Sequence, residues 1–311
     1  MNHYDVIIIG GGPAGLTAGV YSSRAELKTL ILEGTVQVGG QLTLTTTVEN
    51  WPGASDGVNG PQLVVDMRKQ AKKFGCVIKS ESVTEVNFSS KPFVVTSDNS
   101  SYSSDAVIVA TGASARMLGI DSESKLIGRG VSTCATCDGF FFKGKEIFVV
   151  GGGDSAMEEA NFLTKFASKV TVIHRSDKLR ASKIMQSRAK NNPKISFVYN
   201  SVVVEVLGVD DGKVIGVKVK DVNTNEIKEL IGDGLFLAIG HVPNTDFIKS
   251  SGLEFDDNGY VVAKDHVLTN IEGVFVAGDV QDYYYRQAIT ASAMGCMSAI
   301  RTEKYLESLK K

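Results

Sequence analysis

Short apolar runs and amphipathic stretches alternate along the chain, beginning near its N-terminus. Apolar runs at Val6–Ile9 and Leu30–Leu32 flank a stretch from Ala14 to about Arg24 whose apolar positions recur at helical spacing. Short continuous apolar runs are typical of buried strands in a parallel sheet. The order strand, helix, strand therefore predicts a βαβ unit.

The turn that joins the first strand to the helix is rich in glycine. Gly10, Gly12 and Gly15 follow the strand with the G-x-G-x-x-G spacing of dinucleotide-binding units. The first glycine permits a tight turn, the second lets the backbone approach a pyrophosphate, and the third lets the helix pack close to the strand. The phosphates then lie at the helix N-terminus, where unpaired N–H groups favour an anion. Glu33, at the end of the second strand, would accept hydrogen bonds from a ribose.

The same pattern returns further along the chain, with Gly151 in the place of Gly10. Its parts are the strand Ile147–Val150, the loop residues Gly151, Gly153 and Ala156, the helix Asp154–Phe166 and the strand Val170–Ile173. One glycine-rich turn is weak evidence, because such turns also occur where a helix only packs on a sheet. Two in the same register, each between two strands, indicate two nucleotide sites.

The two units differ at the end of the second strand, where His174 stands at the position of Glu33 and Arg175 follows. A carboxylate suits a ribose with a free diol, whereas arginine suits a ribose that carries a 2′-phosphate. We therefore expect the first unit to bind FAD and the second to bind NADPH. The alternative for Arg175 and Arg180 is that both are ordinary solvated charges in a polar stretch.

Each unit closes with an apolar strand that runs into an Ala-x-Gly sequence, and these closures predict the crossings between two domains. They are Ala106–Ala110 before Thr111-Gly112, and Leu235–Ala238 before Ile239-Gly240. A later strand, Val274–Ala277, leads to Gly278-Asp279 and to a long helix from about Arg286 to Leu309. A carboxylate directly after a strand can hold a ribitol hydroxyl of a flavin, or it can cap the next turn.

These elements predict an α/β protein of two Rossmann-like dinucleotide-binding domains, of the three-layer type that binds FAD and NAD(P), with the second domain inserted into the first. The FAD domain is expected at residues 1–113 and 246–311, and the NADPH domain at 114–245. The length agrees with this division, because 311 residues are more than one compact core usually holds.

Composition narrows the class of protein further. With 43% hydrophobic and 22% charged residues the chain is an ordinary globular one, and a formal net charge of -2 gives no indication of nucleic acid or an acidic membrane as a partner. The N-terminal apolar run breaks into glycines, unlike a signal peptide, and no run approaches the roughly 18 apolar residues that span a bilayer. We expect a cytoplasmic protein with no membrane and no nucleic-acid partner.

Two of the four cysteines, Cys134 and Cys137, are separated by two residues and followed by Asp138. This spacing lets a disulfide open and close without unfolding the chain, and Asp138 is placed to hold or deliver a proton. One alternative is half of a zinc site, but no second pair or histidine pattern completes it; the other is a static bridge, whose short loop would stabilise little. We predict a redox-active disulfide and no metal. Cys76 and Cys296 are expected in the core.

With these motifs the chain resembles the low-molecular-weight thioredoxin reductases over nearly its whole length. The resemblance implies an NADPH-dependent thioredoxin-disulfide reductase that contains FAD, forms a homodimer, takes thioredoxin as its partner and serves cell redox homeostasis. The motifs that carry it are Gly10 to Gly15, Gly39-Gly40-Gln41-Leu42, Glu49-Asn50-Trp51-Pro52-Gly53, Ala110-Thr111-Gly112, Cys134 to Gly139, Gly151 to Ala156, His174-Arg175, Gly240-His241, Gly278-Asp279 and Arg286-Gln287-Ala288.

The resemblance also implies a role for each site residue. Cys137 would face the flavin, Cys134 would attack the thioredoxin disulfide, and Asp138 would serve as acid or base. FAD would be held by Gly10, Gly12, Pro13, Ala14 and Gly15, by the segment Glu33 to Gln41 with Gly40, and by Asn50, Thr111, Gly112, Gly278, Asp279, Arg286, Gln287 and Ala288. NADPH would be held by Gly151, Gly153, Asp154, Ser155, His174, Arg175, Arg180 and Ile239.

Two alternatives stand beside this interpretation: a related flavoprotein disulfide reductase with another protein substrate or electron donor, and a nucleotide-binding scaffold without redox activity. Glutathione-reductase-like enzymes are excluded, because their redox cysteines follow the first nucleotide unit and residues 34–47 contain none. The family's basic stretch usually reads His-Arg-Arg, and Ser176 replaces its last arginine here, which bears on the choice of donor. Because the cysteine pair and the nicotinamide site share the inserted domain, we also predict that this domain rotates.

Overall fold

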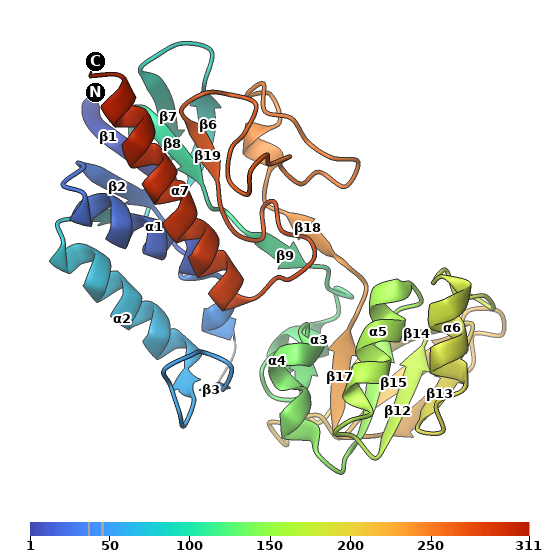
Figure 1. Ribbon diagram of the computed structural model, residues 1–311. Coiled ribbons are helices and arrows are strands. Elements are labelled where there is room, and N and C mark those ends of the chain that lie inside the picture. The colour runs from blue at the N-terminus through green and yellow to red at the C-terminus, as the bar shows by residue number, and fades with distance from the viewer. Residues whose placement is uncertain (37, 45–46, 311) are drawn as a thin grey trace. The chain divides into compact units, whose positions relative to one another are not determined.

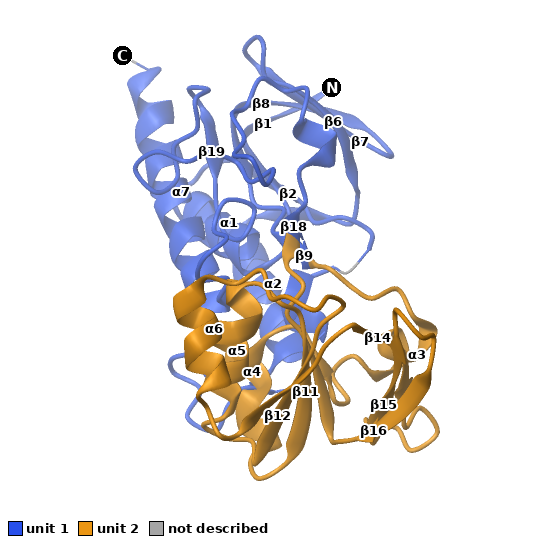
Figure 2. Ribbon diagram, turned by 90° about the vertical axis from the view of Figure 1, so that its right-hand side faces the viewer, with its two compact units in different colours: residues 1–114, 242–311 blue, residues 115–241 orange. Residues whose placement is uncertain are grey.

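The computed structural model describes residues 1–36, 38–44 and 47–310 (Figure 1). They form two compact units, of which the first contains Met1–Ser114 and Val242–Lys311 and the second is the insertion Ala115–His241 (Figure 2). The sequence placed the insertion at 114–245, and the compact unit is shorter than that at its C-terminal end.

The first unit is built on a seven-stranded sheet whose central strands are parallel. β1 pairs with β2 on one side and with β8 on the other, and β19 pairs with β8. Val6 and Ile8 belong to one core and Ile7 and Ile9 to another, because successive side chains of a strand point to opposite faces. The strands are β1 Asn2–Ile9, β2 Thr29–Leu32, β5 Val77–Lys79, β6 Val83–Asn87, β7 Phe93–Ser97, β8 Ser101–Val109 and β19 Val274–Val276, in the order β5-β2-β1-β8-β7-β6 with β19 beside β8.

Three helices pack on one face of this sheet, namely α1 (Pro13–Arg24), α2 (Gly60–Lys73) and α7 (Ala288–Ser308) (Figure 1). α1 and α7 approach closely, because a Cβ on Gly295 would lie 2.2 Å from the carbonyl oxygen of Ala14. α7 begins later than predicted, since Arg286 has a φ of 48° that an α-helix does not contain. The predicted strand, helix, strand unit is confirmed.

The insertion holds a five-stranded parallel sheet, β10-β17-β11-β12-β13, and an antiparallel sheet, β14-β15-β16. The second predicted unit is confirmed by β11 (Glu146–Val150), α5 (Asp154–Leu163) and β12 (Lys169–Ile173). α5 ends earlier than predicted, because the chain turns at Phe166, whose N–H bonds to the Leu163 carbonyl. The other elements are α3 Asp121–Leu126, α4 Ala135–Asp138, α6 Lys183–Lys190, η2 Gly139–Phe142, β10 Val131–Ser132, β13 Ile195–Val198, β14 Ser201–Leu207, β15 Gly216–Asp221, β16 Ile227–Ile231 and β17 Gly234–Leu237.

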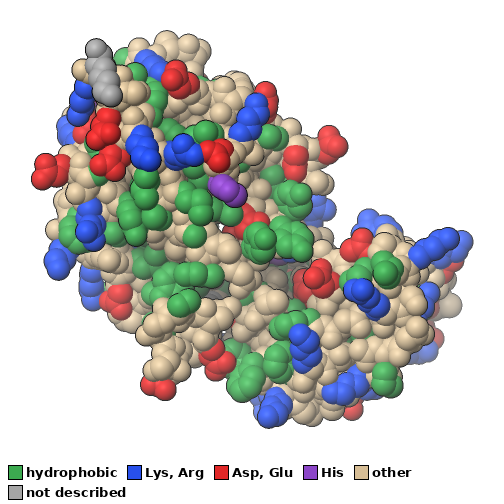
Figure 3. Space-filling model, in the orientation of Figure 1, with side chains coloured by type: hydrophobic (Ala, Val, Ile, Leu, Met, Phe, Trp, Pro, Cys, Tyr) green, Lys and Arg blue, Asp and Glu red, His purple; other side chains and the backbone are tan. Residues whose placement is uncertain are grey.

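The two chain crossings run as paired strands, β9 (Ala113–Ala115) and β18 (His241–Pro243). Acidic and basic side chains are interspersed over the face drawn in Figure 3. Within the described part of the chain, no helix combines the length and the apolar character that crossing a membrane requires. The remaining elements of the first unit are β3 Thr47–Val48, β4 Val58–Asn59, η1 Gly40–Leu44 and η3 Asp246–Ile248.

Candidate active site

The predicted FAD residues of the first unit gather at one edge of its sheet. β1, β2, β8 and β19 are mutually parallel neighbours, so their carboxyl ends lie together. The predicted site residues at these ends, each within two residues of the last strand position, are Gly10, Glu33, Thr111 and Gly278. In open α/β sheets ligands bind outside the carboxyl ends of the strands. The fold therefore brings together residues that are far apart in sequence.

The glycine loop has two close packing contacts and one open position. A Cβ on Gly10 would lie 2.2 Å from the Ala110 carbonyl oxygen, and one on Gly15 would lie 1.9 Å from the Gly10 carbonyl oxygen. A Cβ on Gly12 would meet only the Gly39 carbonyl oxygen, at 4.0 Å. Gly12 is the N-cap of α1 and has no side-chain cap, with Pro13 at the start of the helix. The helix N-terminus thus offers N–H groups beside open space, which fits a pyrophosphate.

Glu33 is fully buried at its side chain and uses only one of its oxygens. Oε1 accepts hydrogen bonds from Arg68 at 2.9 Å and from Ser80 Oγ at 2.7 Å. Oε2 is buried and has no partner among the residues that the structure describes. A ribose hydroxyl would satisfy this oxygen, so the site fits the adenosine ribose of FAD. Sequence reasoning missed Arg68 and Ser80, which no motif marks.

Asp279 lies shortly after the end of β19. Its Oδ1, like Oε2 of Glu33, is buried and has no hydrogen-bond partner among the described residues. Burial raises the pKa of Asp279 to about 7, the negative charge of Asp282 adds to the rise, and the positive charge of Arg286 opposes it. A ribitol hydroxyl that donates to this carboxylate would relieve the cost of burial. Both orphaned oxygens therefore fit the cofactor that the motifs predicted.

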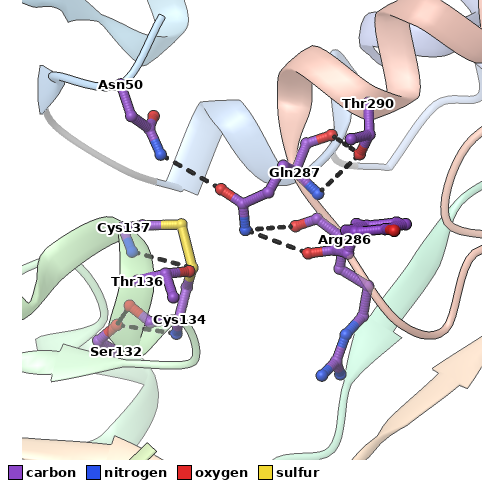
Figure 4. The surroundings of a disulfide bond; sticks show 9 residues. Asn50, Ser132, Cys134, Thr136, Cys137, Arg286, Gln287 and Thr290 are labelled. Carbon is purple, nitrogen blue, oxygen red and sulfur yellow. Dashed lines mark hydrogen bonds between the residues drawn. A yellow bond between two sulfur atoms is a disulfide. The ribbon is translucent and has the colours of Figure 1, made fainter. Parts of the chain in front are cut away.

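The turn Arg286-Gln287-Ala288 is held by a residue that sequence reasoning missed, Asp282. Its carboxylate accepts the backbone N–H groups of Tyr284, Tyr285 and Arg286 at 3.0, 2.9 and 3.3 Å. Gln287 and Thr290 form a capping box at the start of α7. Asn50 Nδ2 donates to Gln287 Oε1 at 3.2 Å, which joins two predicted residues (Figure 4). An Asp shortly before a turn was the available signal.

The other predicted FAD residues are mostly engaged with backbone. A Cβ on Gly40 would lie 3.5 Å from the Gly12 Cα, so these two backbones are close. Gln41 Nε2 donates to the Ala113 carbonyl at 3.2 Å, and Thr111 Oγ1 donates to the Asn244 carbonyl at 2.8 Å. Gly112 has a φ of 68°. Gln37, inside the segment Glu33 to Gln41, lies outside the described residues.

The second glycine loop repeats this arrangement within the insertion. A Cβ on Gly151 would lie 2.4 Å from the Ala238 carbonyl oxygen, whereas one on Gly153 would meet no atom within 4 Å. Gly153 is the N-cap of α5 and has no side-chain cap. Ile239 is half-buried and lies two residues after the end of β17. This helix N-terminus is also open to an anion.

The basic segment after β12 is tied to the second loop through Gly152. The backbone N–H groups of Arg180 and Ala181 donate to the Gly152 carbonyl at 2.7 and 3.0 Å. Arg175 and Arg180 are exposed, so both side chains are accessible to a ligand of the predicted nucleotide loop. Asp154 accepts hydrogen bonds from the backbone N–H and Oγ of Ser182 at 2.7 and 2.8 Å, and Ser155 is exposed.

His174 is buried beneath this loop. A Cβ on Gly152 would lie 2.2 Å from its Cε1, and Nε2 donates to the Lys178 carbonyl at 3.0 Å. Burial lowers the pKa of His174, with the charges of Arg180 and Arg175 acting in the same direction. The ring is therefore neutral at pH 7 and supports the loop that carries the arginines. Its contact with NADPH stays a prediction.

Cys134 and Cys137 form a disulfide, with their Cα atoms 5.3 Å apart, at the start of α4. The Cys137 N–H donates to Cys134 Sγ at 3.2 Å, and the Cys134 N–H donates to Ser132 Oγ at 3.0 Å (Figure 4). Burial raises the pKa of Asp138, and a hydrogen bond with Ser132 opposes the rise. This carboxyl thus keeps its proton to a higher pH than an exposed Asp does.

Cys76 is buried as expected, but Cys296 in α7 is only half-buried, so the expectation of a core position was wrong for Cys296. Within residues 1–36, 38–44 and 47–310, no three or more His, Cys, Asp or Glu side chains are grouped to hold a metal ion.

Sequence reasoning also missed Phe140 and Phe141, which follow the disulfide and are 53% and 39% exposed.

The comparisons with known proteins agree with this geometry. Residues 4–295 match the model of the pyridine nucleotide-disulphide oxidoreductase family. A thioredoxin reductase of Coxiella burnetii is 50% identical over 315 residues, covering 99% of this chain and 98% of the relative. The solved thioredoxin reductases of Giardia duodenalis and Streptococcus pyogenes are each 41% identical, with a TM-score of 0.93, and cover 99% and 98% of this chain and 100% and 99% of their own. The chain therefore belongs to the pyridine nucleotide-disulphide oxidoreductases and, among them, to the thioredoxin reductase family.

Proposed function

We propose that this protein reduces the disulfide of thioredoxin with electrons from NADPH, through FAD and the Cys134–Cys137 pair. The observation that carries the proposal is the disulfide between Cys134 and Cys137, which lies in the same unit as the second glycine-rich loop. The first glycine-rich loop lies in the other unit. When bound, FAD supplies the change from two-electron hydride chemistry to thiol chemistry. The two orphaned oxygens on Glu33 and Asp279 support FAD as the ligand of the first unit.

NADPH is the proposed donor at the second loop. Gly151, Gly153 and the N-terminus of α5 would receive its pyrophosphate, with Asp154, Ser155 and Ile239 around it. The exposed Arg175 and Arg180 would pair with the 2′-phosphate, because guanidinium groups bind phosphate through two parallel hydrogen bonds. His174 holds the loop in place from below.

The dithiol form is proposed to act in two steps. The Cys134 thiolate attacks one sulfur of the thioredoxin disulfide, forms a mixed disulfide and releases one thioredoxin thiolate. The Cys137 thiolate then attacks Cys134 Sγ, which restores the internal disulfide and releases the second thiolate. Asp138, whose pKa burial raises, would protonate a released thiolate. Exposure alone favours Cys137 as the attacking sulfur, but the N–H bond to Cys134 Sγ stabilises a thiolate there and supports the opposite order.

Phe140 and Phe141 would form the docking surface for thioredoxin. The two rings are neighbours in the chain and are exposed, and only Asp138 and Gly139 separate them from Cys137. An apolar contact beside the disulfide would hold the partner while the mixed disulfide forms.

A homodimer is proposed for the first unit. α1 and α7 expose Tyr21, Ile289, Met297 and Ile300, whose exposed fractions are 44%, 43%, 41% and 39%. A second copy would cover these side chains, and light scattering after size exclusion would give the mass. The proposed location is the cytoplasm.

Rotation of the insertion is proposed because it carries both groups that must reach the flavin. Hydride transfer needs the nicotinamide at the flavin and thiol transfer needs the disulfide there, so the two occupy that place in turn. β9 and β18 are the proposed hinge. A variant cross-linked between the two units should lose turnover, and full turnover in that variant would refute the rotation.

The direct test of the proposed function is insulin precipitation with purified protein, thioredoxin, and NADPH or NADH. Precipitation should depend on thioredoxin and on NADPH, and Cys134→Ser should abolish it. NADPH consumption that does not respond to thioredoxin would contradict the proposal.

A further inference from the structure

Arg68 and Ser80 both donate hydrogen bonds to Glu33, and both bonds go to the same carboxylate oxygen. The guanidinium of Arg68 and the hydroxyl of Ser80 donate to Oε1 at 2.9 and 2.7 Å. Oε2 is buried and lacks a partner among residues 1–36, 38–44 and 47–310. A buried carboxylate oxygen without a donor is costly, so an arrangement that saturates one oxygen and leaves the other bare is expected where a ligand completes it.

Local structure fixes this arrangement. β2 and β5 pair with Leu32 opposite Lys79, and the pairing continues as the Glu33 N–H donates to the Lys79 carbonyl at 3.0 Å. Ser80 is therefore placed beside Glu33 by the register of the two strands. Arg68 reaches the same oxygen from α2, whose buried positions, among them Met67, pack in the core of the first unit.

The bare oxygen of Glu33 points at the glycine loop. A Cβ on Gly11 would lie 2.4 Å from Glu33 Cβ and 3.3 Å from Oε2. Gly11 is next to Gly12, the open position at the start of α1. In dinucleotide sites the acidic residue after the second strand accepts a hydrogen bond from a ribose hydroxyl.

We propose that Arg68 and Ser80 are positioning residues for FAD: they fix Oε1 of Glu33, and thereby turn Oε2 toward a hydroxyl of the adenosine ribose. The inference rests on the proposed FAD site. Ser80 is neutral and contributes direction only, whereas Arg68 also places a positive charge 2.9 Å from Oε1 of the buried side chain. The alternative is that Arg68 and Ser80 only attach α2 and β5 to Glu33. They would then stabilise the fold and have no effect on the recognition of the ribose.

The test compares FAD with an analogue whose adenosine carries neither the 2′- nor the 3′-hydroxyl, each titrated into the apoprotein and followed by flavin fluorescence. Ser80→Ala and Arg68→Gln should weaken FAD binding by about fivefold or more, and binding of the analogue by less than about twofold. Lys69→Gln, at the next and exposed position of α2, should change neither affinity. If Arg68 and Ser80 had a purely structural role, their substitution would weaken the binding of FAD and of the analogue equally. It would also lower the melting temperature of the apoprotein.

Ser80→Ala keeps the test valid if Arg68→Gln fails to fold, because Ser80 is exposed and its loss leaves no cavity. Equal losses for FAD and the analogue, or unchanged FAD affinity in Ser80→Ala, would overturn the positioning role alone. An unsubstituted apoprotein that binds neither ligand would overturn the proposed FAD site together with this inference.

Discussion

The backbone N–H of Cys137 donates a hydrogen bond to Sγ of Cys134 across 3.2 Å, so the two sulfurs of one disulfide have different surroundings. Cys134 is half-buried with its own N–H bound to Ser132, and Cys137 is exposed. In the reduced form an N–H donor favours a thiolate on the sulfur that it meets. This asymmetry supports the proposal that each cysteine has a separate task.

The two single cysteine variants should therefore fail differently. In Cys137→Ser, Cys134 can attack thioredoxin, but no second thiol resolves the mixed disulfide, so the partner is trapped covalently. In Cys134→Ser the adduct should be absent or far weaker. Non-reducing gels with reduced variant and oxidised thioredoxin measure this, and dithiothreitol should release the adduct. Trapping by Cys134→Ser alone would reverse the proposed order, and full turnover in either variant would rule out the dithiol mechanism.

Arg175→Ala should raise KM for NADPH about tenfold or more and leave KM for NADH nearly unchanged. A hydrogen bond between charged groups contributes roughly 1.5 to 3 kcal/mol, and about 1.4 kcal/mol is tenfold in binding. Initial rates with both donors give the comparison. Arg188→Ala is a matched control, since Arg188 is an exposed arginine of α6 outside the loop. Equal efficiency with NADPH and NADH in the unsubstituted enzyme would show that Ser176 marks a changed donor.

Asp279 should make the apoprotein less stable as the pH rises from about 4 to about 7. Its pKa is about 7 when folded and 3.8 in its ordinary state, so the folded chain binds its proton more tightly. Stability is then greatest below the lower value and is lost as the pH approaches the higher one, with an upper limit of about 4 kcal/mol.

Asp279→Asn keeps the shape without the charge and should flatten this part of the pH dependence. Melting temperatures of both apoproteins across the range measure the difference. Parallel curves would show that Asp279 does not cause the loss. FAD should reduce the slope in the unsubstituted protein, because a ribitol hydroxyl that donates to the carboxylate favours its charged form.

The sequence predicted the two nucleotide units well because their signals are local. Continuous apolar runs such as Val6–Ile9 mark buried parallel strands, and the spacing of Gly10, Gly12 and Gly15 marks the turn between a strand and a helix. The predicted ends of helices were less exact. The start of α7 was placed too early, because the backbone of Arg286 has a positive φ that cannot be predicted from an arginine side chain.

The residues that support the site could not be predicted in the same way. Arg68 approaches Glu33 from a helix 35 positions away, and no periodic pattern tells which polar residue of α2 reaches the sheet edge. Cys296 was placed in the core on its apolar surroundings, but a helix packed on one side leaves part of every turn uncovered. Such facts depend on packing between distant segments.

The glycine loop of the first unit allows a paired test of packing against ligand space. A Cβ on Gly15 would lie 1.9 Å from the Gly10 carbonyl oxygen, so Gly15→Ala forces the loop away from α1 and should cost about 1 to 3 kcal/mol of stability, as overpacking does. A Cβ on Gly12 would meet only the Gly39 carbonyl oxygen, at 4.0 Å, and the φ of Gly12, -80°, suits alanine.

Gly12→Ala should therefore cost the apoprotein less than about 1 kcal/mol, the usual effect of a poorer N-cap. The added methyl would nevertheless occupy the space proposed for the pyrophosphate, so FAD affinity should fall at least tenfold while the fold persists. Urea unfolding of the two apoproteins gives the first quantity, and FAD titration gives the second. Retention of full FAD affinity in Gly12→Ala would place the pyrophosphate elsewhere, whereas unfolding of Gly12→Ala would show that this position serves packing, as Gly15 does.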